Sequence, residues 1–276
     1  MKRLAKIITV SVAALLATPS IAVQQAWDYT GKNGPAHWSA IYPACSAQMQ
    51  SPIDIPSGTP PNKNLPSLEF VFTPTSAKVV DDGRRLEASM LNKSNTLSIG
   101  SAAYLLTGFN IHLPSENRVA GKAYPAEIQL VYKGKQGALA VVGIFVEPGQ
   151  ANTTLAQFIQ AARRSDGMSS YLNKIKEKIS ASKPLGKHQS DQSGLVINAN
   201  DFLPDDSNAY YSFTGSLTAP PCTGNITWYV LAEPITASAA QLKALEAFYY
   251  NNVRPVQPID GRNIHYKPPE TAQSSS

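Results

Sequence analysis

The chain has 276 residues, of which 43% are hydrophobic, enough to build a large core. Three of its 24 basic residues lie in the first 22 positions, which contain no acidic residue. Without them the chain has 21 basic against 19 acidic residues, so the formal charge of +5 falls to +2. This near balance argues against a nucleic-acid partner, and we expect none.

Residues 1–22 are predicted to be a cleaved signal peptide. Residues 2–6 carry three positive charges, residues 7–16 form a short apolar run, and Ser20 and Ala22 are small residues suited to a cleavage site. The apolar run is too short to span a bilayer, and no later segment approaches the required length. We therefore expect an exported protein, periplasmic or secreted, without a transmembrane segment.

Residues 23–267 are predicted to form one domain, because all-β chains of this size often fold as a single unit. The remaining residues, 268–276, lack periodicity and are predicted to be a disordered tail. Cys45 and Cys222 are the only cysteines. In an exported protein such a pair is expected to form one disulfide rather than two free thiols.

Most of the domain is predicted to be strand. Short segments rich in β-branched and aromatic residues, bounded by Gly, Pro, Asn or Ser, cover residues 68–74, 84–91, 96–100, 103–113, 126–134, 139–149, 209–217 and 225–235. Caps and amphipathic spacing predict helices over residues 152–164, 169–180 and 236–251. Many strands with a few peripheral helices indicate one large, twisted and mostly antiparallel sheet.

Two of these strands carry polar residues at positions that share a face. In "FNIHL" Asn110 and His112 point the same way, and in "AEIQLVY" Glu127, Gln129 and Val131 do so. If the two strands pair, their polar side chains converge. Buried polar groups are costly unless they find partners, so the sequence predicts a polar pocket in the sheet.

Four motifs occur in an order that matches a known family. They are "WDYTGKNGPAHW" with "QSPIDI", "FNIHLPSEN" with "GKAYPAEIQLVY", "GSLTAPPC" with "ITWYV", and "NNVRPVQPIDGR". With them the chain resembles the α-class carbonic anhydrases over nearly its whole mature length. The resemblance implies a mainly β fold of about ten strands, with a conical pocket in which three imidazoles hold zinc. A water bound to such a zinc ionises near neutral pH.

The zinc-ligand positions of that family fall on Asn110, His112 and Gln129. Carboxamides are weak ligands for zinc, so we expect no bound metal and no cofactor. Loss of the metal removes a pKa depression of roughly 9 units, worth about 12 kcal/mol of hydroxide stabilisation. The sequence therefore predicts a pseudoenzyme without catalytic residues for carbon dioxide hydration.

Other family positions are partly retained. The proton-shuttle position is assigned to Asn95, which cannot titrate near neutral pH, and the position that orients the first ligand falls on Gly108. Glu116 and Thr218 occupy the pair that orients the zinc-bound hydroxide, and they can remain because each satisfies the other. Glu127 takes the position that supports the third ligand. The apolar carbon dioxide pocket corresponds to Val131, Val141, Leu217 and Trp228, which are also ordinary core residue types.

Three functions remain open at this point, of which the third is a structural or packing component without a small ligand. The first is an exported binding or recognition module, as the resemblance implies for family members that have lost zinc ligands. Its partner would be a protein or an anionic glycan, and the basic segment 163–187 is a candidate surface, although such a charge run is also typical of a solvated face. The alternative is a carbonic anhydrase, or a weak hydrolase, with an atypical metal site.

Overall fold

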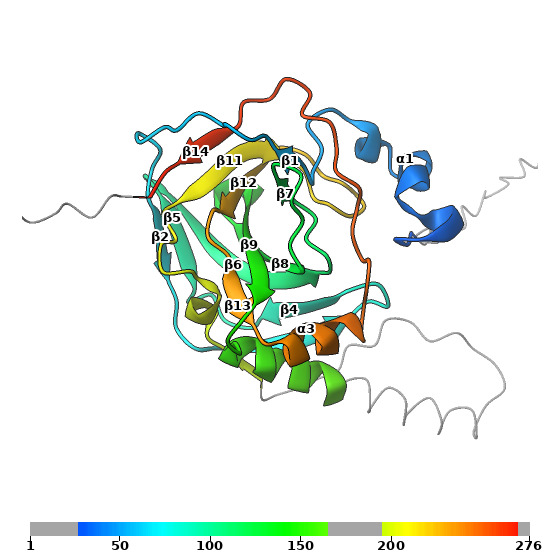
Figure 1. Cartoon of the computed structure of the whole chain (residues 1–276), viewed down its shortest axis with the longest axis vertical. Coiled ribbons are helices and arrows are strands. Elements are labelled where there is room, and N and C mark those ends of the chain that lie inside the picture. The colour runs from blue at the N-terminus through cyan, green and yellow to red at the C-terminus, as the bar shows by residue number, and fades with distance from the viewer. Residues whose placement is uncertain (1–26, 165–194, 270–276) are drawn as a thin grey trace, which may run out of the picture.

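The computed structural model describes residues 27–164 and 195–269 (Figure 1). The predicted signal peptide, the predicted helix over residues 169–180 and most of the basic segment 163–187 lie outside these ranges, as does the tail from residue 270 onward. Within them, no helix is long and apolar enough to cross a membrane.

A sheet of twelve strands forms the body of the described structure. Its main path runs β10-β3-β4-β6-β8-β9-β12-β11-β14, with β5 attached beside β6, β2 beside β5, and β13 beside β9. The strands are β2 (Leu68–Val71), β3 (Thr75–Asp81), β4 (Leu86–Met90), β5 (Thr96–Ile99), β6 (Ala102–His112), β8 (Ala126–Lys133), β9 (Leu139–Pro148), β10 (Leu195–Ile197), β11 (Tyr210–Gly215), β12 (Ile226–Leu231), β13 (Ile235–Ala237) and β14 (His265–Lys267).

The predicted mainly β fold is confirmed, and all eight predicted strand segments contain a strand of this sheet. Neighbouring strands are antiparallel except where β9 pairs with β12 and with β13. A separate parallel pair joins β1 (Asp54–Ile55) to β7 (Arg118–Val119).

Helices are few in the described part. They are α1 (Trp38–Ile41), a helix over residues 153–164 and α3 (Ala239–Glu246), with short 3-10 turns at Gly31–Asn33, Pro35–His37, Pro43–Ser46, Lys135–Gly137 and Ala199–Phe202. The helix predicted over residues 236–251 is shorter than expected. Its first residues belong to β13, because they pair with β9, and the helix begins after Ser238, whose side chain accepts a hydrogen bond from Gln241 N.

The two faces of the sheet have different roles. The helix over residues 153–164 and α3 lie together against one face (Figure 1), where Phe158 and Leu242 join the main apolar core. In β8, Ile128 and Leu130 point into that core, whereas Gln129 lines a cavity. This alternation leaves the polar residues of the central strands for the cavity, on the face away from the helices.

The predicted disulfide is confirmed: Cys45 and Cys222 are bonded, with their sulfur atoms 2.05 Å apart. The bond ties the N-terminal turns to the loop between β11 and β12. A small apolar cluster surrounds it and includes Trp38 and Ala219. Because Ala219 also lines the cavity, this cluster holds one side of the cavity rim in place.

Candidate functional site

The pairing of β6 with β8 brings the predicted polar residues together. Asn110 lies directly opposite Gln129, and His112 lies opposite Glu127. Directly opposed residues of an antiparallel pair project to the same side of the sheet. The expected convergence of these four side chains is therefore confirmed by the register.

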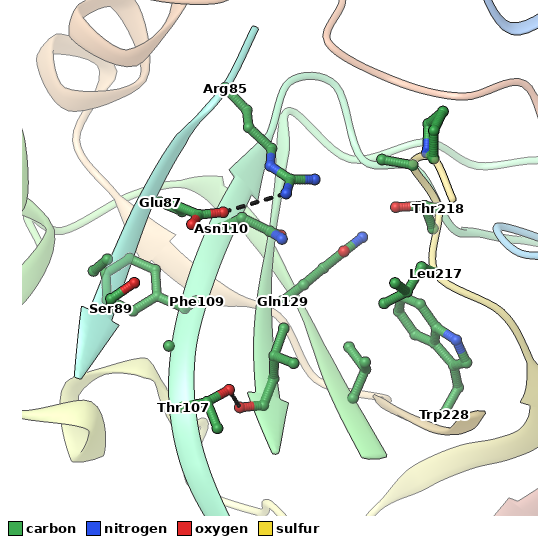
Figure 2. Close-up of a pocket in the computed structure, with 16 residues that line it drawn as sticks. Arg85, Glu87, Ser89, Thr107, Phe109, Asn110, Gln129, Leu217, Thr218 and Trp228 are labelled. Atoms are coloured by element: carbon green, nitrogen blue, oxygen red, sulfur yellow. Dashed lines mark hydrogen bonds and ion pairs between the residues drawn. The ribbon is translucent and has the colours of Figure 1, made fainter. Parts of the chain in front are cut away.

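A cavity of about 290 Å³ opens above the paired strands. Asn110, Gln129 and Thr218 point into it in Figure 2. The four predicted apolar residues, Val131, Val141, Leu217 and Trp228, also line it. The carboxamides thus lie on one side of the cavity, and the Thr218 hydroxyl lies on the opposite side, next to Leu217 (Figure 2).

His112 lies behind the cavity and is fully buried. Its Nδ1 is 2.7 Å from the carbonyl oxygen of Asn252, and because a carbonyl only accepts, Nδ1 donates. Its Nε2 lies 3.4 Å from Glu116 Oε2 and has no hydrogen-bond partner in the described part of the chain. Burial lowers the pKa of His112 to about 4, against the opposing effects of Asn252 and Glu127. The imidazole is therefore neutral at neutral pH, with its proton on Nδ1.

Glu116 is the carboxyl at the centre of this buried layer. Its oxygens accept hydrogen bonds from the backbone N of Arg254 at 2.9 Å and from Gln129 Nε2 at 3.0 Å. Burial raises its pKa to about 7, although hydrogen bonds from Thr218, Arg254 and Gln129 lower it in part. The predicted contact of Glu116 with Thr218 is confirmed.

Glu127 contributes to the site in a different way from the one predicted. Its Oε2 accepts from the backbone N of Glu116 at 2.9 Å and of Asn117 at 2.8 Å, and its Oε1 accepts from Asn117 Nδ2 at 2.7 Å. These bonds tie β8 to the loop that carries Glu116. We therefore interpret Glu127 as an anchor for that loop rather than a support for Gln129.

Asn95 is not a pocket residue, contrary to the prediction. It is fully buried ahead of β5, where its Oδ1 accepts from Thr73 N at 2.8 Å and its carbonyl accepts from Leu106 N at 2.9 Å. It is not among the residues that line the cavity. Its carboxamide instead fastens the turn between β4 and β5, which explains why a polar residue is buried there.

Arg85 and Glu87 line the cavity and were not predicted to do so. Arg85 directly precedes β4, and Glu87 lies opposite Asn110 in the pairing of β4 with β6. Arg85 Nη2 is 3.3 Å from Glu87 Oε2, and its guanidinium points toward Asn110 and Gln129 in Figure 2. The signal was available, since polar residues alternate along "RRLEASML" as they do along "FNIHL".

Gly108 marks a further change in the floor of the pocket. A side chain at this position would begin with a Cβ 2.2 Å from the backbone oxygen of Ala88. Strands β4 and β6 thus approach each other too closely for any side chain there. A side chain that orients the first ligand position could therefore not be restored here without moving a strand.

Solved structures with the same architecture are available for comparison. The α-carbonic anhydrase of Photobacterium profundum matches with a TM-score of 0.70 and 32% sequence identity, over 87% of this chain and 100% of that one. Dioscorin, in a complex with ascorbate, matches with a TM-score of 0.73 and 27% identity, over 90% of this chain and 100% of that one. Sheet and pocket together thus define an α-carbonic anhydrase fold.

Sequence comparisons agree with the fold. The model of the eukaryotic-type carbonic anhydrase family matches residues 33–268. A carbonic anhydrase of Klebsiella pneumoniae is 34% identical over 261 residues, which cover 91% of this chain and 96% of that protein. The chain therefore belongs to the eukaryotic-type, or α-class, carbonic anhydrase family, whose enzymes are carbon dioxide-hydrating lyases.

Proposed function

We propose that this member of the family works without zinc, as a small-ligand binding protein rather than a carbon dioxide hydratase. The observation that carries the proposal is the composition of the pocket floor, where Asn110 and Gln129 face the cavity beside the Arg85 guanidinium. Ligand binding at such a pocket needs no metal, whereas hydration in this family does.

The residues brought together do not fit a zinc ion. Carboxamides are poor zinc ligands, and the Nε2 of Gln129 is already donated to Glu116. Across residues 27–164 and 195–269, no three His, Cys, Asp or Glu side chains are grouped so that they could hold a metal. The positive charge of Arg85 also opposes a divalent cation in the same cavity. The weak carboxamide ligands and the charge of Arg85 both lower the affinity of the site for zinc.

The pocket also offers no substitute for metal-activated water. Water without a metal keeps a pKa near 15.7, far from neutral pH. His112, Glu116 and Glu127 are fully or almost fully buried, and none of them is among the residues that line the cavity. A general base must reach the proton that it removes, so these groups are poorly placed for the task.

Carbonic anhydrase activity with an atypical metal site is the second candidate function. The retained contact between Thr218 and Glu116 and the apolar wall favour it, as do the relatives that are named carbonic anhydrase. The dioscorin structure supports the first candidate, because that related protein holds a small molecule, ascorbate.

Besides the pocket, the basic segment 163–187 is a proposed binding surface for a macromolecular partner. An anionic protein or glycan at the basic segment 163–187 stays a prediction, since only Arg163 and Arg164 of this segment lie in the described structure. Both are exposed on the helix over residues 153–164. Neutralising Lys174, Lys176 and Lys178 together is expected to abolish binding to such a partner.

Zinc competition tests the proposed function directly. The purified protein, titrated against a chromophoric zinc chelator, is expected to take up no stoichiometric zinc. The double variant Asn110→His with Gln129→His is expected to gain one zinc, because the strand register already presents both positions to one site. Gln150→His with Asn200→His, two exposed positions outside the cavity, is the matched control. Stoichiometric zinc in the unchanged protein would contradict the proposal.

A further inference from the structure

The cavity has a cation whose hydrogen-bonding capacity is incompletely used. Arg85 makes two ion pairs in the described structure, with Glu87 at 3.3 Å and with Asp82 at 4.0 Å. Both distances are longer than the roughly 2.7–2.9 Å that is typical of hydrogen bonds between charged groups. The Nε of Arg85, which is the atom that pairs with Asp82, is buried and has no hydrogen-bond partner among the described residues. The guanidinium lines the cavity and is held by these long ion pairs, so it can still donate a shorter, stronger hydrogen bond to a ligand.

An acceptor without a partner lies beside this cation. Seven buried side-chain atoms in the described part of the chain lack a hydrogen-bond partner, and two of them belong to residues that line the cavity: the donor Arg85 Nε and the acceptor Asn110 Oδ1. The Nε2 of Gln129 donates to Glu116, which leaves the carboxamide oxygen as its remaining acceptor. A ligand that satisfies this site must accept hydrogen bonds at one point and donate one at another.

The apolar side of the cavity sets a third requirement. Trp228 and Leu217 lie across the cavity from Arg85 in Figure 2, and Val131 and Val141 also line it. The volume of about 290 Å³ is near the lower end of ligand pockets. A small molecule with one apolar part would remove this wall from water, while its polar part faces Arg85 and Asn110.

We propose that the pocket binds a small 2-hydroxy acid in its anionic form. Its carboxylate accepts hydrogen bonds from Arg85, its hydroxyl donates to Asn110 Oδ1, and its apolar body lies along Trp228 and Leu217. This inference rests on the proposal that the pocket holds no zinc. Glu87 competes with the ligand for Arg85, so its negative charge limits the affinity.

Three small molecules test these requirements separately. The affinity of each is measured by isothermal titration calorimetry on protein that has been treated with a metal chelator and confirmed to be zinc-free. Mandelate carries a hydroxyl, a carboxylate and a ring. Phenylacetate lacks the hydroxyl, and benzyl alcohol lacks the carboxylate. Mandelate is expected to bind about 3- to 10-fold more tightly than phenylacetate, and about 10- to 100-fold more tightly than benzyl alcohol.

Variants assign the contacts to residues. Arg85→Gln is expected to weaken mandelate binding about 10- to 100-fold, since it removes a charged partner. Arg84→Gln makes the same charge change at the neighbouring position and is the matched control, because Arg84 stacks on Trp27, donates to its carbonyl and does not line the cavity. Arg84 shares Asp82 with Arg85, so the affinity of this variant for mandelate is expected to stay within about two-fold of that of the unchanged protein. Glu87→Gln is expected to strengthen binding several-fold.

A second variant keeps the test decisive if Arg85→Gln does not fold. Asn110→Leu has a similar shape and is expected to remove the difference between mandelate and phenylacetate. Equal mandelate affinity in the unchanged, Arg85→Gln and Arg84→Gln proteins would overturn the inference. So would the absence of mandelate binding to folded, zinc-free protein, and this result leaves the zinc-free function standing. Binding that appears only after zinc is added would instead contradict the proposed function.

Discussion

Replacing Glu116 with glutamine is expected to remove a pH-dependent loss of stability. Burial raises the pKa of Glu116 from its ordinary value of 4.5 to about 7 in the folded protein. The folded state therefore keeps a proton that the unfolded chain releases. Stability from this group is fully present below pH 4.5 and is lost as the pH rises through about 7.

The size of this effect follows from the shift. One pKa unit corresponds to about 1.4 kcal/mol, so a rise from 4.5 to about 7 gives about 3 kcal/mol in total. Between about pH 5 and about pH 8, roughly 2 to 3 kcal/mol of it is lost. Nearby Gln129, Thr218 and Arg254 all donate hydrogen bonds to Glu116, and Arg85 adds a positive charge, which together keep the pKa from rising further.

Urea unfolding followed by tryptophan fluorescence measures this difference. The free energy of unfolding of the unchanged protein is compared at about pH 5 and about pH 8 with that of Glu116→Gln, which is neutral at both. From about pH 5 to about pH 8, the free energy of unfolding is expected to fall by about 2 to 3 kcal/mol more in the unchanged protein than in the variant. The other titrating groups, His112 among them, are common to the two proteins, so their contributions cancel in this comparison. The same pH dependence in both proteins would refute the reasoning and show that Glu116 is ionised throughout.

Three further changes probe the buried layer, the strand spacing and the disulfide. Burial lowers the pKa of His112 to about 4, so the free energy of unfolding falls as the pH falls from 6.5 through about 4. In urea unfolding, His112→Asn should reduce this loss of stability at acid pH. An unchanged loss would count against a buried neutral imidazole. Gly108→Ala places a Cβ against Ala88 O and should cost about 1–3 kcal/mol in thermal unfolding, whereas an unaltered Tm would contradict the close approach of the strands. Cys45→Ala with Cys222→Ala opens a loop of 177 residues and should cost up to about 5 kcal/mol in urea unfolding, so equal stability would argue against a structural disulfide.

The fold and part of the pocket could be predicted because their signals are local. The period-2 alternation of "FNIHL" and "AEIQLVY" places Asn110 and Gln129 on one face, and the register brings them opposite each other. The apolar wall followed from the family motifs. By contrast, β13 and β14 are only three residues long and carry too short a pattern to be recognised.

The rest of the site depends on contacts between distant segments. Arg85 enters the cavity because β4 pairs with β6, and the position of that pairing is not visible in either strand alone. Asn95 looked like a pocket residue by position along the chain, yet it is used to fasten a turn through Thr73. Both cases show that a motif assigns faces of a strand more securely than it assigns residues in the neighbouring loops.

The central claim is that the pocket works without zinc. Its most direct test is the metal content of the purified mature protein by mass spectrometry, paired with stopped-flow carbon dioxide hydration with and without added zinc. We expect no stoichiometric zinc and no hydration above the uncatalysed rate in either condition. Stoichiometric zinc together with inhibitable hydration would contradict this account and would show that Asn110, His112 and Gln129 are completed by another ligand.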